Sequence, residues 1–253
     1  MKLDGVAAVV TGGASGLGEG TARELASAGV KVTIFDLNEE RGPSVASDIG
    51  GQFVKVNVAD EASVTAGLDA AEAAHGTPRV LINCAGIAHG EKTVTKGKPH
   101  DLKIFTRLIT VNLIGTFNVI RLTAARMVGA EPMEDNERGV IVNTASVAAF
   151  DGQIGQVAYS ASKGGVVGMT LPIARDLSRD GIRVCTIAPG LFRTPMMDTL
   201  PPHIQKALGD SVPFPQRLGT PGEYAALARH ICENTMLNGE TIRLDGAIRL
   251  APR

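Results

Sequence analysis

The 253-residue sequence predicts a single α/β domain, in which a doubly wound parallel sheet of about seven strands carries helices on both faces. Short β-branched runs alternate with longer helical patterns, which is typical of parallel strands connected by helices. The first run, Val-Ala-Ala-Val-Val, is apolar throughout, as expected of a strand buried on both faces. We find no repeat or linker in the sequence that divides residues 1–253 into smaller domains.

The β-branched runs predict strands at residues 6–10, 31–36, 52–56, 79–83, 140–144, 183–187 and 241–244. Helical periodicity predicts helices near residues 16–29, 39–49, 60–75, 102–128, 157–179 and 222–234. Three stretches interrupt this alternation. We expect a basic loop at 88–103, an acidic surface excursion at 129–139, and a substrate-covering region at 191–219 that contains a short helix around 202–209.

The composition excludes several classes of protein. The net charge of −1 provides no field that would attract nucleic acid or an anionic membrane, and no apolar run reaches the roughly 20 residues that span a bilayer. Three widely spaced cysteines and five histidines fit no disulfide framework or metal site. The first strand begins at residue 6 and leaves no room for a presequence. We therefore expect a cytoplasmic protein without metal, nucleic-acid or membrane partners.

A glycine-rich turn follows the first predicted strand and opens the first helix. Its glycines, Gly12, Gly13, Gly16 and Gly18, would let the backbone approach a pyrophosphate, while the helix N-terminus offers free N–H groups. The spacing differs from the general Gly-x-Gly-x-x-Gly dinucleotide fingerprint, and the missing lysine after Gly18 argues against a P-loop. The turn predicts a dinucleotide site; close packing of helix against strand is the alternative.

Asp36 ends the second predicted strand and indicates which dinucleotide is bound. A carboxylate at this place accepts hydrogen bonds from both ribose hydroxyls and repels a 2′-phosphate. No basic residue stands where it could bind that phosphate: Leu37 and Asn38 follow Asp36, and Ser15 lies in the glycine turn. The sequence therefore favours NAD over NADP. A helix cap is the alternative role for Asp36, although Asn38 could serve equally well.

Tyr159 and Lys163 predict a proton-transfer site beside the nucleotide. Within a helix they lie one turn apart on the same face. An ammonium near a phenol favours the phenolate, whose ordinary pKa of about 10 is too high for a base at neutral pH. Ser146, thirteen residues earlier, could orient a substrate oxygen. The alternatives are a core tyrosine, an ordinary serine at a strand end and, for Asn112, a residue that caps or kinks its helix.

These residues, with Asn83-Cys84-Ala85-Gly86 and Pro189-Gly190, occur in the order of the short-chain dehydrogenase/reductase family, which the sequence resembles over nearly its whole length. The resemblance implies a Rossmann-type fold. Residues 115–122, 143–150 and 237–240 are similar to one branch of the family, the type II 3-hydroxyacyl-CoA dehydrogenases, also called type 10 17β-hydroxysteroid dehydrogenases. That branch carries insertions where 88–103 and 129–139 lie.

The resemblance also implies a role for each site residue. Tyr159 would be the general base and Ser146 would hold the substrate oxygen. Lys163 would bind the nicotinamide ribose and lower the Tyr159 pKa, and Asn112 would anchor a water. The residues expected to contact NAD are Gly12, Ser15, Gly16, Leu17, Gly18, Asp36, Asn57, Val58, Cys84, Ala85, Gly86, Tyr159, Lys163, Pro189, Phe192 and Thr194. Many relatives have Asp in place of Asn57 and Asn in place of Cys84.

The function expected from these observations is NAD-dependent oxidation of (S)-3-hydroxyacyl-CoA to 3-oxoacyl-CoA, in fatty-acid or branched-chain catabolism. The resemblance implies a homotetramer. For the substrate, we expect CoA phosphates to meet Lys92, Lys96 and Lys98, and an acyl chain to meet Leu191, Met196, Met197, Leu200 and Leu208. For each lysine alone, a solvated loop is the simpler explanation.

Two other functions are kept open. One is a hydroxysteroid or other secondary-alcohol dehydrogenase with the same catalytic residues. The other is an NAD-binding scaffold or redox sensor, although such a protein has no need of Ser146, Tyr159 and Lys163 together. A reductase acting on acyl carrier protein is disfavoured, because those enzymes commonly use NADPH and Asp36 argues against it.

Overall fold

The computed structural model describes residues 1–198 and 200–252, and within these ranges the side chains of Met196 and Asp198 are not described. Its main sheet contains seven strands in the order β3-β2-β1-β4-β7-β8-β9, all parallel. This confirms the predicted fold class. The strands are β1 (Ala7–Thr11), β2 (Lys31–Asp36), β3 (Gln52–Lys55), β4 (Val80–Asn83), β7 (Gly139–Thr144), β8 (Ile182–Pro189) and β9 (Thr241–Leu244).

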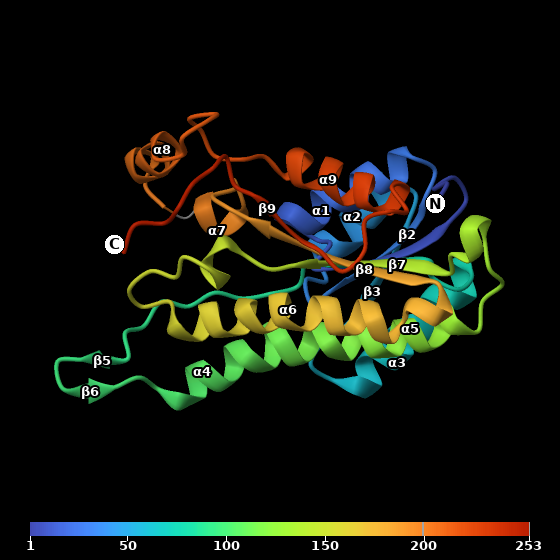
Figure 1. Ribbon diagram of the computed structural model, residues 1–253, viewed down its shortest axis with the longest axis horizontal. Coiled ribbons are helices and arrows are strands. Elements are labelled where there is room, and N and C mark those ends of the chain that lie inside the picture. The colour runs from blue at the N-terminus through green and yellow to red at the C-terminus, as the bar shows by residue number, and fades with distance from the viewer. Residues whose placement is uncertain (199, 253) are drawn as a thin grey trace.

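Helices cover both faces of this sheet (Figure 1). One face packs against α1, α2 and α9 and the other against α3, α5 and α6. The α-helices are α1 (Gly16–Ser27), α2 (Arg41–Asp48), α3 (Glu61–His75), α4 (Leu102–Ile109), α5 (Thr116–Val128), α6 (Val157–Asp176), α7 (Pro195–Asp198), α8 (Pro202–Asp210) and α9 (Pro221–Glu233). Short 3₁₀ turns occur at Glu134–Asn136, Val147–Ala149 and Ser178–Asp180.

The core follows from the alternation of side chains along the strands. Val10 and Ile82 belong to the apolar cluster under α1 and α9, whereas their neighbours Val9 and Leu81 belong to the cluster under α3 and α5. All four side chains are fully buried. A sheet that is apolar on both faces explains why the predicted strands are apolar throughout.

Two predicted segments differ from the structure. The predicted loop at 88–103 contains a short antiparallel hairpin, β5 (Val94–Thr95) and β6 (Lys98–Pro99). Lys96 and Gly97 form its turn, both with positive φ, and the hairpin projects from the body of the molecule (Figure 1). The predicted helix at 102–128 is interrupted by one π-helical turn, Thr110–Gly115, between α4 and α5. Two-residue strands and π turns have no distinct hydrophobic period, so pattern alone misses them.

The continuous helix Leu102–Val128 is long and apolar enough, by length and composition alone, to cross a membrane. It has a mean hydropathy of 1.4, and half of its most apolar window is buried. The expectation that no segment reaches this length is therefore wrong for this helix. Val119, Ile120 and Met127 pack into the core beneath the sheet, which accounts for their apolar character. Core helices of globular proteins commonly have this composition.

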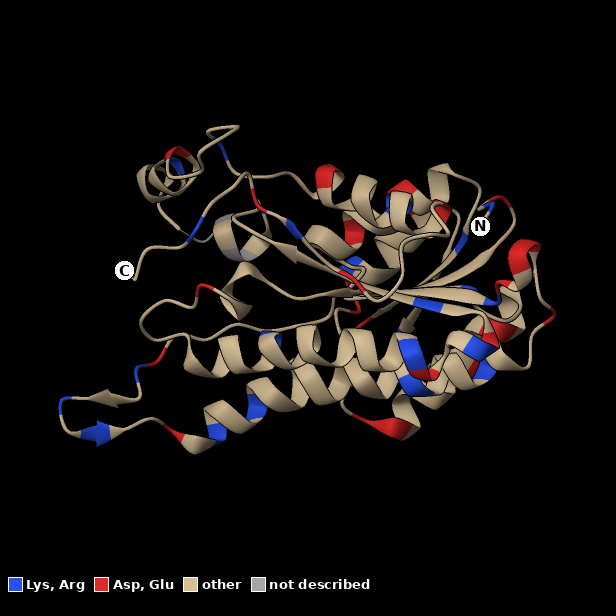
Figure 2. Ribbon diagram, in the orientation of Figure 1, with Lys and Arg blue, Asp and Glu red and all other residues tan. Residues whose placement is uncertain are grey.

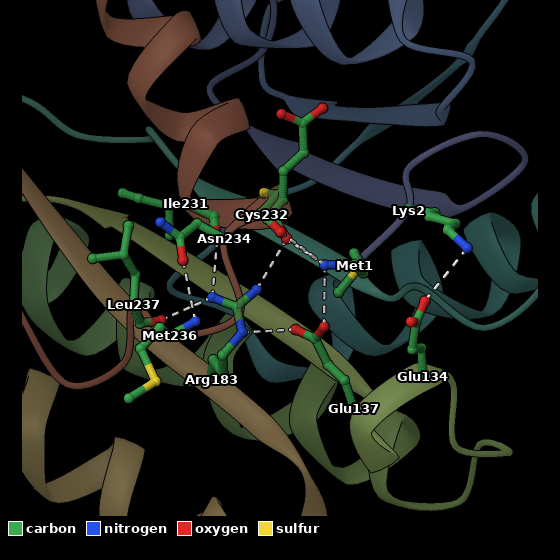
Figure 3. A network of polar contacts seen from close by, with 11 residues as sticks. Met1, Lys2, Glu134, Glu137, Arg183, Ile231, Cys232, Asn234, Met236 and Leu237 are labelled. Carbon is green, nitrogen blue, oxygen red and sulfur yellow. Dashed lines mark hydrogen bonds and ion pairs between the residues drawn. The ribbon is translucent and has the colours of Figure 1, made fainter.

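A buried arginine joins the ends of several elements at the amino edge of the sheet (Figure 3). Arg183 on β8 donates to Glu137 Oε1 at 2.7 Å, and both side chains are less than a tenth exposed. The same guanidinium donates to the main-chain carbonyls of Ile231, Cys232 and Leu237, which follow or end α9. One cation thus satisfies a buried carboxylate and three buried carbonyls.

Arg183→Met is therefore expected to lower the free energy of unfolding by about 3 kcal/mol, because it leaves Glu137 and the carbonyls without that donor. The exposed pair of Lys2 and Glu134, at 3.4 Å, is a control in the same region. Lys2→Met is expected to cost less than about 1 kcal/mol. Urea denaturation of both variants measures the difference, and equal losses would contradict this account of the network.

Candidate active site

The carboxyl ends of the parallel strands place the predicted site residues along one edge of the sheet. The chain adds β2 and β3 on one side of β1 and then crosses to β4 on the other side, and ligands of open α/β sheets bind at such a switch point. Thr11, at the end of β1, lies opposite Asn83 of β4, which in turn lies opposite Asn143 of β7. The glycine turn follows β1 directly, so it borders this crevice.

The glycine turn brings its backbone too close to its neighbours for side chains. Gly12 has φ +66°, and a β-carbon on it would lie 2.8 Å from the main-chain nitrogen of Ala85. A β-carbon on Gly18 would collide with the Gly12 carbonyl. Ser15 precedes the first residue of α1, and its side chain makes no cap hydrogen bond there. The turn thus presents bare backbone and a helix N-terminus, which fits a pyrophosphate.

Asp36 is held by main-chain donors on both sides. Its Oδ2 accepts from Ala14 N in the glycine turn, and its Oδ1 accepts from Asn38 N, each at 3.0 Å. Sequence reasoning missed Arg41, whose Nε donates to the Ala14 carbonyl at 3.1 Å. Its Nη2 lies 2.6 Å from Glu19 Oε2, which offsets its charge. No sequence motif marks Arg41, since α2 brings it to the turn.

The residues expected near the adenine and the adjoining ribose are fixed by local hydrogen bonds. Asn57 Oδ1 accepts from Ala59 N at 3.1 Å, and the Val58 carbonyl accepts from Asn118 Nδ2 at 2.9 Å. After β4, Ala85 N donates to Thr11 Oγ1 at 3.1 Å. These bonds fix the segment after β3 to α5 and the segment after β4 to the end of β1.

Asn112 clamps the segment after β4 to helix α6. It lies in the π-helical turn and is fully buried. Its Oδ1 accepts from Ile87 N and its Nδ2 donates to the Ile87 carbonyl, both at 2.8 Å; Nδ2 also donates to Ser162 Oγ at 3.1 Å. The side chain is therefore committed to protein partners. The water-anchoring role that the resemblance implies stays a prediction.

Lys163 is a buried cation at the centre of the site. Its ammonium donates to the main-chain carbonyl of Thr144 at 2.8 Å, and a β-carbon on Gly86 would lie 3.6 Å from it. Burial lowers the pKa of Lys163 to about 8. Thr144 shares a 2.7 Å hydrogen bond with the buried Tyr224 hydroxyl, and its own hydroxyl donates to Cys84 Sγ at 3.3 Å. Burial raises the pKa of the Cys84 thiol, which suits a neutral packing residue.

Tyr159 and Ser146 meet at the entrance of helix α6. Burial raises the pKa of the Tyr159 phenol, and its hydrogen bond with the Ser146 hydroxyl lowers it by less. The Lys163 ammonium is bound to the Thr144 carbonyl and lies 5.9 Å from the centre of the Tyr159 ring, and it is not a cause of this shift in the chain alone. That Lys163, helped by the positive nicotinamide, lowers the Tyr159 pKa stays a prediction.

The covering region begins at the end of β8 and returns over the glycine turn. Gly190 N, directly after Pro189, donates to the Leu244 carbonyl at 2.9 Å, and Phe192 is buried in the core. A β-carbon on Gly16 would lie 3.7 Å from Thr194. Thr194 thus lies against the glycine turn, and the contact of Phe192 and Thr194 with the nicotinamide stays a prediction. Of the expected acyl-chain residues, Met196 has a side chain outside the described residues.

A cavity of about 500 Å³ opens beside the Tyr159 end of α6. Gly90 and Glu91 at the base of the hairpin lie against Gly155, with Glu91 N donating to its carbonyl at 2.8 Å. The cavity is lined by residues 92–94 on one side and by residues 152–155, Val157 and Ser160 on the other. Lys92 therefore borders it, whereas Lys96 and Lys98 lie on the projecting hairpin (Figure 2).

A glycine turn beside Ser146, Tyr159 and Lys163 is the arrangement of an oxidoreductase that uses a nicotinamide cofactor, and comparisons with known proteins agree with this class. The family model described as short chain dehydrogenase matches residues 6–205. A protein named 3-hydroxyacyl-CoA dehydrogenase type-2 from Drosophila melanogaster is 56% identical, over 96% of this chain and 97% of its own. The chain therefore belongs to the short-chain dehydrogenase family.

Two solved structures share the fold. A 3-hydroxyacyl-CoA dehydrogenase type-2 from Mycobacterium avium is 45% identical with a TM-score of 0.95, and the alignment covers 98% of both chains. A 3-ketoacyl-(acyl-carrier-protein) reductase from Brucella melitensis, complexed with NADH, is 30% identical with a TM-score of 0.87. That alignment covers 98% of this chain and all of the reductase.

The lowered pKa of Lys163 predicts how stability depends on pH. Between about 8 and the ordinary 10.5, the unfolded chain binds more protons than the folded one, so stability rises with pH. The unfolding free energy of the wild type, minus that of Lys163→Met, is expected to increase by about 2 kcal/mol from about pH 7 to about pH 9.5. Urea denaturation measures this difference; a constant value would mean that the ammonium is not desolvated.

Proposed function

We propose that the protein is an NAD-dependent dehydrogenase that oxidises (S)-3-hydroxyacyl-CoA to 3-oxoacyl-CoA. The observation that carries the reaction type is the meeting of Ser146, Tyr159 and Lys163 beside a glycine turn at the carboxyl edge of the sheet. The substrate class is supported by the names of relatives that share more than half of this sequence over nearly the whole chain.

NAD, rather than NADP, is the cofactor in this proposal. The Asp36 carboxylate is fixed at the glycine turn by Ala14 N and Asn38 N, where it would accept the hydroxyls of the adenosine ribose and repel a 2′-phosphate. Arg41 is close to the turn, but its charge is paired with Glu19. The remaining cofactor contacts are those expected from the sequence, from the glycine turn to Thr194.

Tyr159 removes the proton from the substrate hydroxyl in this mechanism, and Ser146 donates a hydrogen bond to the same oxygen as charge develops on it. Lys163 stabilises the tyrosinate that accepts this proton, and it binds the nicotinamide ribose. The nicotinamide, when bound, accepts the hydride from the substrate carbon. Buried walls around Lys163 keep water away and strengthen these electrostatic effects.

The cavity beside α6 is the proposed entrance for the acyl-CoA. Lys92 at its rim, with Lys96 and Lys98 on the adjacent hairpin, offers cations to the phosphates of coenzyme A. Apolar side chains of the covering region, including Leu191, Met197 and Leu208, would receive the acyl chain. A hydroxysteroid or other secondary-alcohol substrate would use the same catalytic residues without those cations.

We further propose a cytoplasmic homotetramer. The outer surfaces of α4, the π-helical turn, α5 and α6 expose Leu102, Ile114, Phe117 and Leu171, each more than two-fifths accessible. Apolar groups at this density favour burial between copies of the chain. Sedimentation should give the mass of four chains, and a monomer would contradict the assembly.

The free thiols of Cys84, Cys185 and Cys232 suit a reducing compartment.

Tyr159→Phe tests the proposed reaction. The wild type should form NADH from NAD and (S)-3-hydroxybutyryl-CoA, which is measured by NADH absorbance, and should use NADP much more weakly. Loss of the phenolic proton acceptor should lower kcat at least about a hundredfold while leaving NAD affinity unchanged. Turnover of a steroid alcohol alone would shift the proposal to the alternative substrate. An inactive wild type that still binds NAD would instead favour a scaffold or sensor.

Neutralising Lys92, Lys96 and Lys98 together, each to Gln, tests the acyl-CoA entrance. The KM for the CoA substrate should rise about tenfold, about 0.5 kcal/mol for each exposed cation, with kcat unchanged. Lys2, Lys31 and Lys55, exposed elsewhere on the chain, provide the control triple variant. An unchanged KM, or equal changes in both triple variants, would show that the hairpin lysines do not meet the substrate.

A further inference from the structure

The last strand carries an arginine that reaches toward the loop joining the two catalytic hydroxyl residues. Arg243 on β9 places Nη2 at 2.5 Å from Asp151 Oδ2 and Nε at 2.7 Å from Asp245 Oδ2. Nη2 also donates to the Ile248 carbonyl at 2.9 Å, and the guanidinium lies 5.3 Å from the centre of the Phe150 ring. Asp151 stands between Ser146 and Tyr159 in the chain, so this cation bridges the site's own loop and the C-terminal end.

Two further hydrogen bonds join the same partners. Gln153 Nε2 donates to the Ala251 carbonyl at 2.9 Å, and Ile154 N donates to the Pro252 carbonyl at 3.0 Å. We call residues 245–252 the C-terminal strap, and Figure 1 shows this segment running from β9 toward the loop that precedes α6. The strap therefore holds the loop at residues 153 and 154, and Arg243 on β9 holds it at residue 151.

The loop in turn fixes the start of α6. Asp151 N donates to the Val147 carbonyl at 2.9 Å, which links it to the turn that Ser146 begins. A β-carbon on Gly152 would collide with Ser160 Oγ, so the loop is packed directly on the residue after Tyr159. Residues 152–155 also form one wall of the cavity beside α6. Any shift of the loop would move both this wall and the first turn of the helix.

The ion pair of Arg243 and Asp151 is suited to such a role. Both side chains are about one-fifth exposed, so water screens their attraction only partly. The guanidinium fork has a fixed planar geometry, which sets direction as well as charge. Arg243 lowers the pKa of Asp151, so the carboxylate stays charged through the neutral range.

We propose that Arg243 is a positioning residue that, with the C-terminal strap, sets the separation of Ser146 and Tyr159 and the wall of the substrate cavity. The inference rests on the proposed function, since it assigns no chemistry to Arg243 itself. Displacements of about 1 Å in catalytic groups can cost orders of magnitude in rate. The strap should therefore act on turnover without acting on NAD affinity, because the loop segment that it and Arg243 hold, residues 151–154, contains none of the residues expected to contact NAD.

Arg243→Gln is the test variant and Arg126→Gln its matched control. Arg126 is also about one-fifth exposed and also bridges two carboxylates, Asp69 and Glu72, but between α3 and α5. Arg243→Gln should lower kcat/KM for (S)-3-hydroxybutyryl-CoA about tenfold beyond Arg126→Gln, with the NAD dissociation constant unchanged. Amide hydrogen exchange in residues 147–160 should accelerate about tenfold in Arg243→Gln alone. Arg243→Lys, which keeps the charge, should recover part of the rate.

Equal kcat/KM and equal exchange in the two variants would overturn the proposal. Asp151→Asn, which removes the other half of the pair, should reproduce the rate loss and the local exchange, and decides the question if Arg243→Gln does not fold. The two proposals fail separately. A wild type without turnover would refute the proposed function, and accelerated exchange confined to residues 147–160 would then still support the strap.

Discussion

The burial of the Lys163 ammonium at the carboxyl edge of the sheet is the constraint on which the site depends. A cation removed from water must keep a partner, and the Thr144 carbonyl at the end of β7 provides it at 2.8 Å. Gly86 lies beside this cation, and the Asn112 clamp fixes the segment that carries Gly86 against α6. The π-helical turn, the segment after β4 and the end of β7 thus lie around one buried charge.

Burial of the Tyr159 phenol explains why this residue is not a ready base within the chain alone. Desolvation disfavours the phenolate, and Lys163 is directed to Thr144 rather than to the phenol. Under the proposed function, the cationic nicotinamide and its ribose supply the missing electrostatic support. Proton abstraction is then linked to cofactor binding, because the buried phenolate is favoured only when the cofactor is bound. The C-terminal strap adds a purely geometric condition, because it holds the loop between Ser146 and Tyr159.

Much of this structure could be predicted because its signals are local. Apolar β-branched runs located all seven strands, and the turn glycines with Asp36 located the crevice at β1 and β2. The features that the sequence could not predict depend on contacts between distant segments. Arg41 reaches the glycine turn only through α2, and Thr144 receives Lys163 only because β7 ends beside α6. Spacing on a helix likewise predicts that Lys163 lies near Tyr159, but not that its ammonium binds the Thr144 carbonyl in the chain alone.

The most direct test is a pH titration of Tyr159 itself, monitored by tyrosinate absorbance, with and without NAD. The chain has no tryptophan and two tyrosines, and burial raises the pKa of the second, Tyr224, well above its ordinary value. We predict that the pKa of Tyr159 lies above the ordinary tyrosine value in the free protein and below it with NAD bound, and that Tyr159→Phe loses this signal. An identical pKa in both states would contradict the account, because the cofactor would then leave the base unprepared.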